Sequence, residues 1–151
     1  MARYLIVAHQ TAASEELIEQ VRSLASEDPS SEFVLLVPAT PIEHLLTWSE
    51  GESRALASRD AETARAALEA AGVNVVRADV GDSSPLMAIE DELSEHQGAC
   101  DAMVISTFPP GLSRWLKLDL PHQAERKFKL PVIHVIAERR GPAEQRPPSA
   151  L

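Results

Sequence analysis

Two short polar segments of this sequence contain the side chains best suited to bind a small molecule. His9 and Gln10 follow an apolar run at 4–8, and Ser106 and Thr107 follow another at 102–105. Their imidazole, amide and hydroxyl groups can each donate or accept hydrogen bonds. Apolar runs of this length are typical of buried parallel strands, whose carboxyl ends face the ligand crevice of an open sheet. The sequence therefore predicts that any small-molecule site lies where these strands end.

A third apolar run at 33–37 and the loop after Thr107 complete the predicted crevice. The candidate ligand-binding residues are Ala8, His9, Gln10, Val37, Pro38, Ser106, Thr107, Pro109, Gly111, Ser113 and Arg114. A concave crevice with convergent hydrogen-bond donors would indicate a binding protein. A crevice filled by Phe108, Pro110 or Trp48 would indicate a protein that works only through interactions.

No residue pattern typical of catalysis or of a metal site is found in the sequence. His9 and His122 would form an acid–base pair or a metal site if both faced the crevice, but no Cys or carboxylate lies at a supporting spacing. Asp79 and Asp82 are expected to form turns or to interact with helix ends. Cys100 lacks a partner, so a reactive thiol is the less favoured interpretation. We expect neither an enzyme nor a metal site.

Strand-like and helix-like segments alternate along the chain. Predicted strands cover 4–8, 33–37, 73–78, 102–105 and 132–136, and predicted helices cover about 14–27, 52–71, 85–97 and a segment from Asp119. This alternation predicts a five-stranded parallel sheet with helices on both faces. Residues 1–137 are expected to form one domain, with a flexible Pro- and Arg-containing tail at 138–151. The long connection at 38–51 is either a lid or binding segment, or simply mobile.

Composition excludes several classes of partner. The 151 residues carry a formal net charge of −9, which disfavours binding to nucleic acid and to anionic lipid. No apolar run approaches the length of a membrane span. The single cysteine excludes an internal disulfide and fits a reducing compartment. We expect a cytoplasmic protein.

Residues 3–136 resemble the universal stress protein family. The resemblance rests on the first strand at 5–8, on the segment 81–85 with Ile89, and on the segments 101–107 and 130–132 around the last strand–loop–helix–strand unit. It implies a doubly wound fold of the adenine-nucleotide α-hydrolase-like type, with strand order 3-2-1-4-5 and a crevice between strands one and four. It also implies a homodimer formed through the last strand, with Val132, His134 and Ile136 at the interface.

Many members of that family bind ATP through a loop of the form Gly-x2-Gly-x9-Gly-Ser/Thr, and this loop is replaced here. Its positions fall on Ser106, Pro109, Asp119 and Leu120. Pro109 has no backbone N–H for a phosphate oxygen. Asp119 is expected to satisfy the helix N-terminus with its own carboxylate. The first-strand aspartate that contacts the base in ATP-binding members is replaced by His9 or Gln10.

Two functions therefore remain open. The first is a non-catalytic stress-response or regulatory module that acts as a homodimer and does not bind ATP in the usual way. The second is a binder of a small ligand, for example AMP or ATP, in which Ser113, Arg114 and Lys117 compensate for the missing glycines. Arg114 and Lys117 are also compatible with the solvated face of a short helical turn, with Trp115 in the core.

Overall fold

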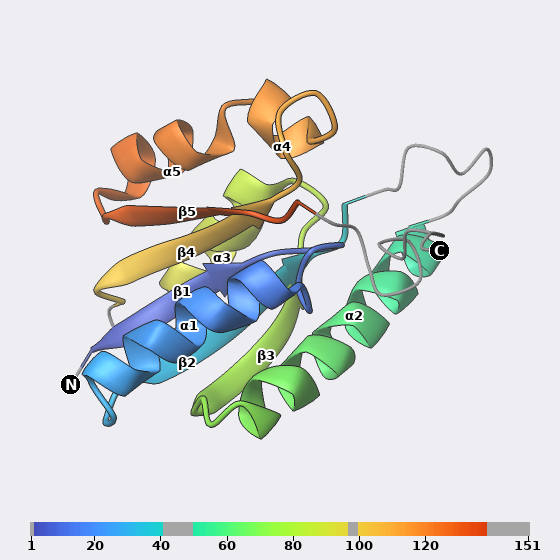
Figure 1. Ribbon diagram of the computed structural model, residues 1–151. Helices are drawn as coiled ribbons and strands as arrows, with labels where there is room; N and C mark the ends of the chain where they lie inside the picture. Colours follow the sequence, from blue (N-terminus) through green and yellow to red (C-terminus); the bar gives the residue numbers. More distant parts are fainter. Residues whose placement is uncertain (1, 41–49, 97–99, 139–151) are drawn as a thin grey trace, which may run out of the picture.

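The computed structural model describes residues 2–40, 50–96 and 100–138 (Figure 1). The elements in chain order are β1 (Arg3–Val7), α1 (Glu15–Glu27), β2 (Glu32–Pro38), α2 (Glu50–Ala70), β3 (Val75–Gly81), α3 (Pro85–Glu95), β4 (Ala102–Thr107), α4 (Arg114–Lys117), α5 (Leu120–Phe128) and β5 (Val132–Ile136). The strands form a five-stranded sheet of order β3-β2-β1-β4-β5, and each neighbouring pair is parallel. The predicted fold class and strand order are confirmed.

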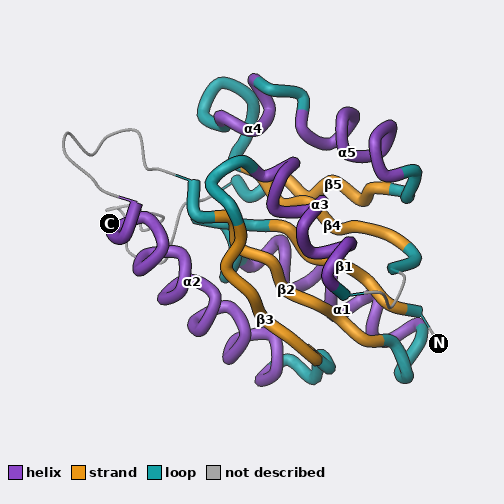
Figure 2. Tube along the Cα trace, turned by 180° about the vertical axis from the view of Figure 1, so that it is seen from behind, coloured by secondary structure: helices purple, strands orange, loops and turns teal. Residues whose placement is uncertain are grey.

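Helices cover both faces of the sheet. α1 and α2 pack on one face through a cluster that contains Leu17, Val21 and Leu68. α3 and α5 pack on the opposite face, seen from behind in Figure 2, through a cluster that contains Ile89 and Ala124. The sheet is therefore buried on both sides, as a doubly wound fold requires.

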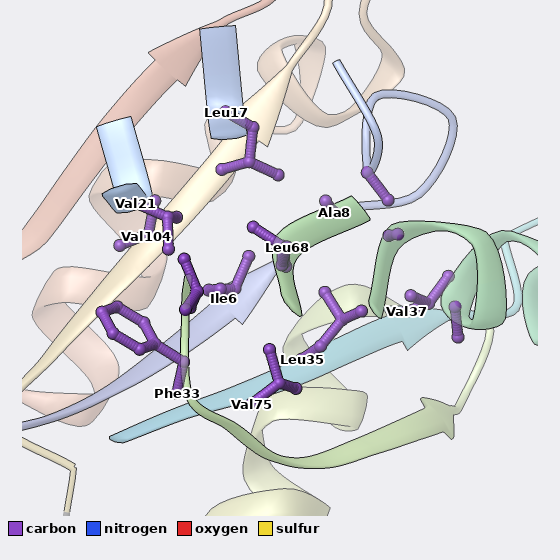
Figure 3. Close-up of a cluster of buried hydrophobic side chains, with 14 of the residues drawn as sticks. Ile6, Ala8, Leu17, Val21, Phe33, Leu35, Val37, Leu68, Val75 and Val104 are labelled. Atoms are coloured by element: carbon purple, nitrogen blue, oxygen red, sulfur yellow. The ribbon is translucent and has the colours of Figure 1, made fainter. Parts of the chain in front are cut away.

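The strand β2 shows why a continuous apolar run indicates a buried strand. Phe33, Leu35 and Val37 lie in the cluster under α1 and α2, where Figure 3 shows them. Val34 and Leu36 lie in the cluster on the opposite face. Because successive side chains of a strand point to opposite faces, a strand covered on both sides is continuously apolar. β3 is an edge strand, as its less apolar sequence indicated.

Capping residues set the helix boundaries close to the predicted ones. Ser14 caps α1, and its Oγ accepts a hydrogen bond from the backbone N–H of Leu17 at 3.2 Å. Ser84 caps α3, with Pro85 in the first turn. Gly72 follows α2 with a φ of 91°, a conformation that favours glycine.

The prediction that Asp79 forms a turn is wrong. β3 continues to Gly81, so Asp79 lies inside the strand. A Cβ at Gly81 would lie only 2.7 Å from the Cβ of Ala88, so glycine lets β3 approach α3 closely. Asp82 does form the predicted turn, because its Oδ1 accepts a hydrogen bond from the backbone N–H of Ser84 at 2.9 Å.

β4 is also longer than predicted and includes Ser106 and Thr107. These residues were expected in the loop, but they sit at the end of a buried strand. Most of the 38–51 connection, with Trp48, and the tail from 139 onward lie outside the described residues. Within the described residues, no helix combines the length and the apolar character needed to span a membrane.

Candidate ligand crevice

The candidate site lies where the chain reverses its direction across the sheet. β1 and β4 are neighbours, with Val7 opposite Ile105, and they end at the same edge of the sheet (Figure 1). The helix after β1 packs on one face, and α5 after β4 packs on the other. In open parallel sheets this reversal creates a crevice outside the carboxyl ends of the strands. Of the candidate residues, Ala8 and His9 directly follow β1, and Ser106 and Thr107 end β4.

A hydroxyl pair ties the loop after β1 to the end of β4. Thr11 Oγ1 and Ser106 Oγ lie 2.7 Å apart and share a hydrogen bond. Both residues are buried, each with 1% of its surface exposed. Each hydroxyl therefore uses part of its hydrogen-bonding capacity inside the protein.

The hydroxyl of Thr107 is also occupied. Its Oγ1 donates to the backbone carbonyl of Phe108 at 2.9 Å and lies 2.8 Å from His134 Nε2. Ser113 behaves similarly, because its Oγ accepts the backbone N–H of Leu116 at 3.1 Å and caps the short helix α4. The hydroxyls predicted to contact a ligand thus already form hydrogen bonds within the protein, with Thr11, with His134 or with the backbone.

His9 is the exception. Its side chain is 7% exposed, and its Nε2 is a buried polar atom that has no hydrogen-bond partner in the described part of the chain. Burial lowers the pKa of His9 from 6.5 to about 4, so the imidazole is neutral at pH 7. A buried ring nitrogen without a partner costs about 1–3 kcal/mol in desolvation. His9 is therefore the group at this edge that a bound ligand would satisfy.

The other candidates contribute less to a polar site. Ala8 and Val37 belong to the apolar cluster under α1 and α2, and the backbone N–H of Ala8 donates to the carbonyl of Leu36. Gln10 and Gly111 are exposed, Pro38 is buried and Pro109 is half-buried. The side chain of Arg114 lies outside what the structure describes. Trp115 is buried, as predicted, and Lys117 is exposed.

The expectation that Asp119 caps α5 with its carboxylate is wrong. Asp119 has a φ of 55° and makes no side-chain hydrogen bond to the helix backbone. N-cap side chains reach the helix N–H groups from the extended region of φ and ψ, and the left-handed conformation of Asp119 turns its side chain elsewhere. Its Oδ1 instead accepts a hydrogen bond from His122 Nδ1 at 2.9 Å.

The structure does not pair His9 with His122. His9 is buried beside β1, whereas the His122 side chain is 73% exposed and lines a cavity with His134 of β5. His134 was expected at a dimer contact, but its hydrogen bond to Thr107 was not anticipated. That bond depends on the register that sets Ile105 opposite His134, and no local sequence signal encodes it.

No family model and no curated protein sequence matches the chain. Solved structures of universal stress proteins do match it over most of its length. A universal stress protein in complex with cAMP is 16% identical, covers 90% of this chain and 98% of its own, and has a TM-score of 0.56. The Archaeoglobus fulgidus protein in complex with dAMP is 15% identical, with coverages of 89% and 97% and a TM-score of 0.59. An Arabidopsis thaliana family protein with AMP bound is 12% identical, with coverages of 91% and 93% and a TM-score of 0.56.

This chain has the universal stress protein fold. The resemblance drawn from residues 3–136 is confirmed at the level of the fold, which is what structural likeness at such low identity establishes. Within the universal stress protein fold, the edge where β1 and β4 end is the switch point of the sheet, and His9 lies there.

A second polar cluster lies at the edge strand β3, between β3 and α3. Arg77 Nε lies 2.9 Å from Asp79 Oδ2 and 3.1 Å from Glu92 Oε2, and its Nη2 also binds Glu92. His96 Nε2 lies 3.8 Å from both carboxylates. Burial raises the pKa of Glu92, with a further contribution from the nearby Asp79, while Arg77 opposes the rise. A cavity of about 390 Å³ adjoins the cluster.

Asp79, Glu92 and His96 form the group in the described residues whose ligand atoms all lie within 4.8 Å of one another, a spacing compatible with a metal ion. The guanidinium of Arg77 already supplies a positive charge to both carboxylates. A cation would have to bind beside that charge or displace it. The geometry therefore favours a structural ion-pair network over a metal site.

Cys100 fits the structural interpretation. It is a buried free cysteine, and burial is the main cause that raises the pKa of its thiol. A thiol with a raised pKa stays protonated at neutral pH and is a poor nucleophile.

Proposed function

We propose that the chain is a non-catalytic regulatory module that binds an adenine mononucleotide in the crevice between β1 and β4. The observation that carries the proposal is the buried, unpartnered Nε2 of His9 at the switch point of the fold. Proteins of the same fold have been solved with cAMP, dAMP and AMP, which are all nucleoside monophosphates.

His9 suits recognition of a base. A neutral imidazole has one N–H donor and one acceptor nitrogen, and adenine offers both an amino donor and ring acceptors. Either tautomer of His9 can therefore pair with an adenine edge. By the family resemblance, His9 or Gln10 also replaces the aspartate that contacts the base, and Gln10 is exposed whereas His9 is buried.

A triphosphate is disfavoured. Pro109 offers no backbone N–H, and the carboxylate of Asp119 places a negative charge just before α5. The chain also carries a formal net charge of −9, so each added phosphate increases the repulsion. A monophosphate, with a charge of about −2, meets less of this repulsion.

Catalysis is not part of the proposal. A nucleophilic mechanism needs a base within hydrogen-bond reach of a nucleophile. His9 Nε2 has no such partner in the described residues. The hydroxyls of Thr11 and Ser106 bond to each other instead.

The test is thermal unfolding of the protein with AMP, cAMP, ADP and ATP–Mg. AMP at a hundred times its dissociation constant should add about 2.7 kcal/mol to the free energy of unfolding. The His9→Leu variant should lose this response, and the Gln10→Ala variant, changed at the exposed neighbour, should keep it. A larger response to ATP–Mg than to AMP would overturn the proposal, and so would no response to any of the four nucleotides.

The Thr11–Ser106 hydrogen bond favours a second candidate, a module that works through interactions and binds no nucleotide. This bond holds the loop after β1 against β4 and reduces the space between them. The partner would be a second copy that adds to the free edge of β5, the outermost strand of the sheet. Of the predicted interface residues, Val132 packs partly into the core and His134 bonds Thr107, so Ile136 is the most available.

A further inference from the structure

A cavity of about 170 Å³ lies between the α4–α5 segment and β5, apart from the proposed nucleotide crevice. Besides Asp119, whose carboxylate is hydrogen-bonded to His122, three of its lining residues carry atoms that bind metals: His122 and Glu125 of α5, and His134 of β5. His122 and Glu125 are three residues apart, so they lie on the same side of the helix. Helix and strand thus present two imidazoles and one carboxylate to the same space.

The hydrogen bond of His122 fixes which of its nitrogens is free. Nδ1 lies 2.9 Å from Asp119 Oδ1. An ionised carboxylate can only accept, so Nδ1 carries the proton and donates it. The lone pair of the neutral ring is therefore on Nε2. A carboxylate that holds the other nitrogen of an imidazole is typical of metal-ligating histidines.

The hydrogen bonds of His134 also leave one ring nitrogen available to a metal ion, but on this ring it is Nδ1 and not Nε2. Thr107 Oγ1 donates its one proton to the Phe108 carbonyl at 2.9 Å. His134 Nε2, which lies 2.8 Å from that oxygen, must therefore be the donor of the second bond. The lone pair of His134 is then on Nδ1.

The third candidate ligand is the carboxylate of Glu125, which is not paired with a positive charge in the described residues. The carboxylate of Glu125 has no ion pair or side-chain hydrogen bond within residues 2–40, 50–96 and 100–138. Among the described side chains, no lysine or arginine lines the cavity. This distinguishes it from the Asp79–Glu92–His96 group, where Arg77 already binds the two carboxylates.

We infer that His122, His134 and Glu125 form a binding site for a divalent transition-metal ion, with zinc as the best match. Two imidazoles and one carboxylate, with an open fourth position, are a donor set that zinc accepts in tetrahedral geometry. In this structure the three ligand atoms are not all within 4.8 Å of one another, so binding requires the side chains of the three residues to move closer together. Asp119 and Thr107 would hold the second nitrogens of the two rings.

The site does not depend on the proposed function, but it touches the same strand. Thr107, which positions His134, is the last residue of β4, next to Ser106 of the crevice. A metal ion at His134 would thus fix the end of a strand that lines the crevice.

The experiment is titration of the untagged full chain with Zn²⁺ by calorimetry, and with Co²⁺ by absorption spectroscopy, since tetrahedral Co²⁺ absorbs strongly in the visible range. One ion per chain is expected. His122→Asn and His134→Asn should each weaken binding by about 10–100-fold, and Asp119→Asn by about tenfold. Far-UV circular dichroism and unfolding in EDTA establish that each variant folds.

Two matched controls change other histidines. His96→Asn tests the Asp79–Glu92–His96 group, and His44→Asn tests a histidine outside the described residues. Both variants should bind the ion as the wild type does. Loss of binding in either control with no change in His122→Asn and His134→Asn would overturn the inference, as would the absence of saturable binding in the wild type.

Discussion

Two residues of this protein bury a polar side chain to the same extent and stabilise it in opposite ways. Glu92, between β3 and α3, is 6% exposed, and its carboxylate is bound by Arg77. His9, after β1, is 7% exposed, and its Nε2 has no partner in the described residues. The first group is compensated by an opposite charge, whereas the second avoids the larger cost of a buried charge by staying neutral.

The contrast separates a structural network from a candidate site. The Arg77 cluster contains more atoms that could bind a metal or a ligand than the crevice does, but its carboxylates are already paired with the guanidinium of Arg77. In the crevice, His9 Nε2 has no partner among the described residues and lies at the switch point of the fold. Ranked by residue type alone, the Arg77 cluster would come first. The state of their hydrogen bonds reverses that order.

The largest effect is expected from Arg77→Met. Removing the guanidinium leaves the buried Glu92 without its cation, which should cost about 3 kcal/mol in the free energy of unfolding measured by urea denaturation. The double variant Arg77→Met with Glu92→Leu should recover much of that loss, because no buried charge remains. If the single variant is as stable as the wild type, Arg77 does not stabilise the buried carboxylate of Glu92, and the cluster is not a structural ion-pair network. The Arg77→Met variant should also bind Zn²⁺ through Asp79 and His96, because it lacks the guanidinium charge that disfavours a cation in the wild type.

The unpaired state of His9 predicts a pH dependence. Its pKa is about 4 in the folded protein and 6.5 in the unfolded chain, so the unfolded chain binds more protons between these values. Stability is therefore fully present above pH 6.5 and is lost as the pH falls from 6.5 to 4, by about 3 kcal/mol in total.

His9→Leu should remove this dependence and should be as stable as the wild type, or slightly more so, at pH 7. Glu92 contributes the opposite slope, since its pKa is raised and its burial costs more as the pH rises. Urea denaturation at several pH values separates the two residues. An acid slope that His9→Leu leaves unchanged would mean that His9 acquires a partner in solution.

The Thr11–Ser106 bond should give a smaller effect. Thr11→Val keeps the shape of the side chain but removes the hydroxyl, which should cost about 1 kcal/mol because Ser106 is left unsatisfied. Adding Ser106→Ala should cost little more, so a double-mutant cycle measures the coupling. If the losses of stability of the two single variants simply add up in the double variant, the two hydroxyls do not interact. In that case the crevice is open to ligand at this point.

The smallest change in stability is expected at Ile136, which ends the edge strand β5 and is 36% exposed. Ile136→Lys should alter the free energy of unfolding by less than about 0.5 kcal/mol. If a second copy pairs with β5, the same change should convert a dimer into a monomer in sedimentation velocity. An unchanged sedimentation profile would count against the homodimer.

The fold was predictable because its signals are local. Continuous apolar runs such as 33–37 indicate strands buried on both faces, and Ser14, Ser84 and Gly72 mark helix ends through their own side chains or lack of one. The errors arose where partners are distant. Asp79 was predicted to form a turn because the sequence does not reveal its contact with Arg77 in the cluster that includes Glu92. Asp119 was predicted to cap a helix because residue type does not reveal its φ of 55°.

The order of residues along the chain was sufficient to predict the alternation of strands and helices, the location of the polar segments at the carboxyl ends of strands, and the replacement of the phosphate loop by Pro109 and Asp119. Which polar groups are free depends on contacts between distant residues. Strand register brings His134 to Thr107, and the reversal at β1 and β4 brings Thr11 to Ser106 and leaves His9 Nε2 without a partner in the described residues. The physical reason is that hydrogen bonding between distant residues depends on angstrom-scale approach, whereas hydrophobic patterning depends only on the order of residues along the chain.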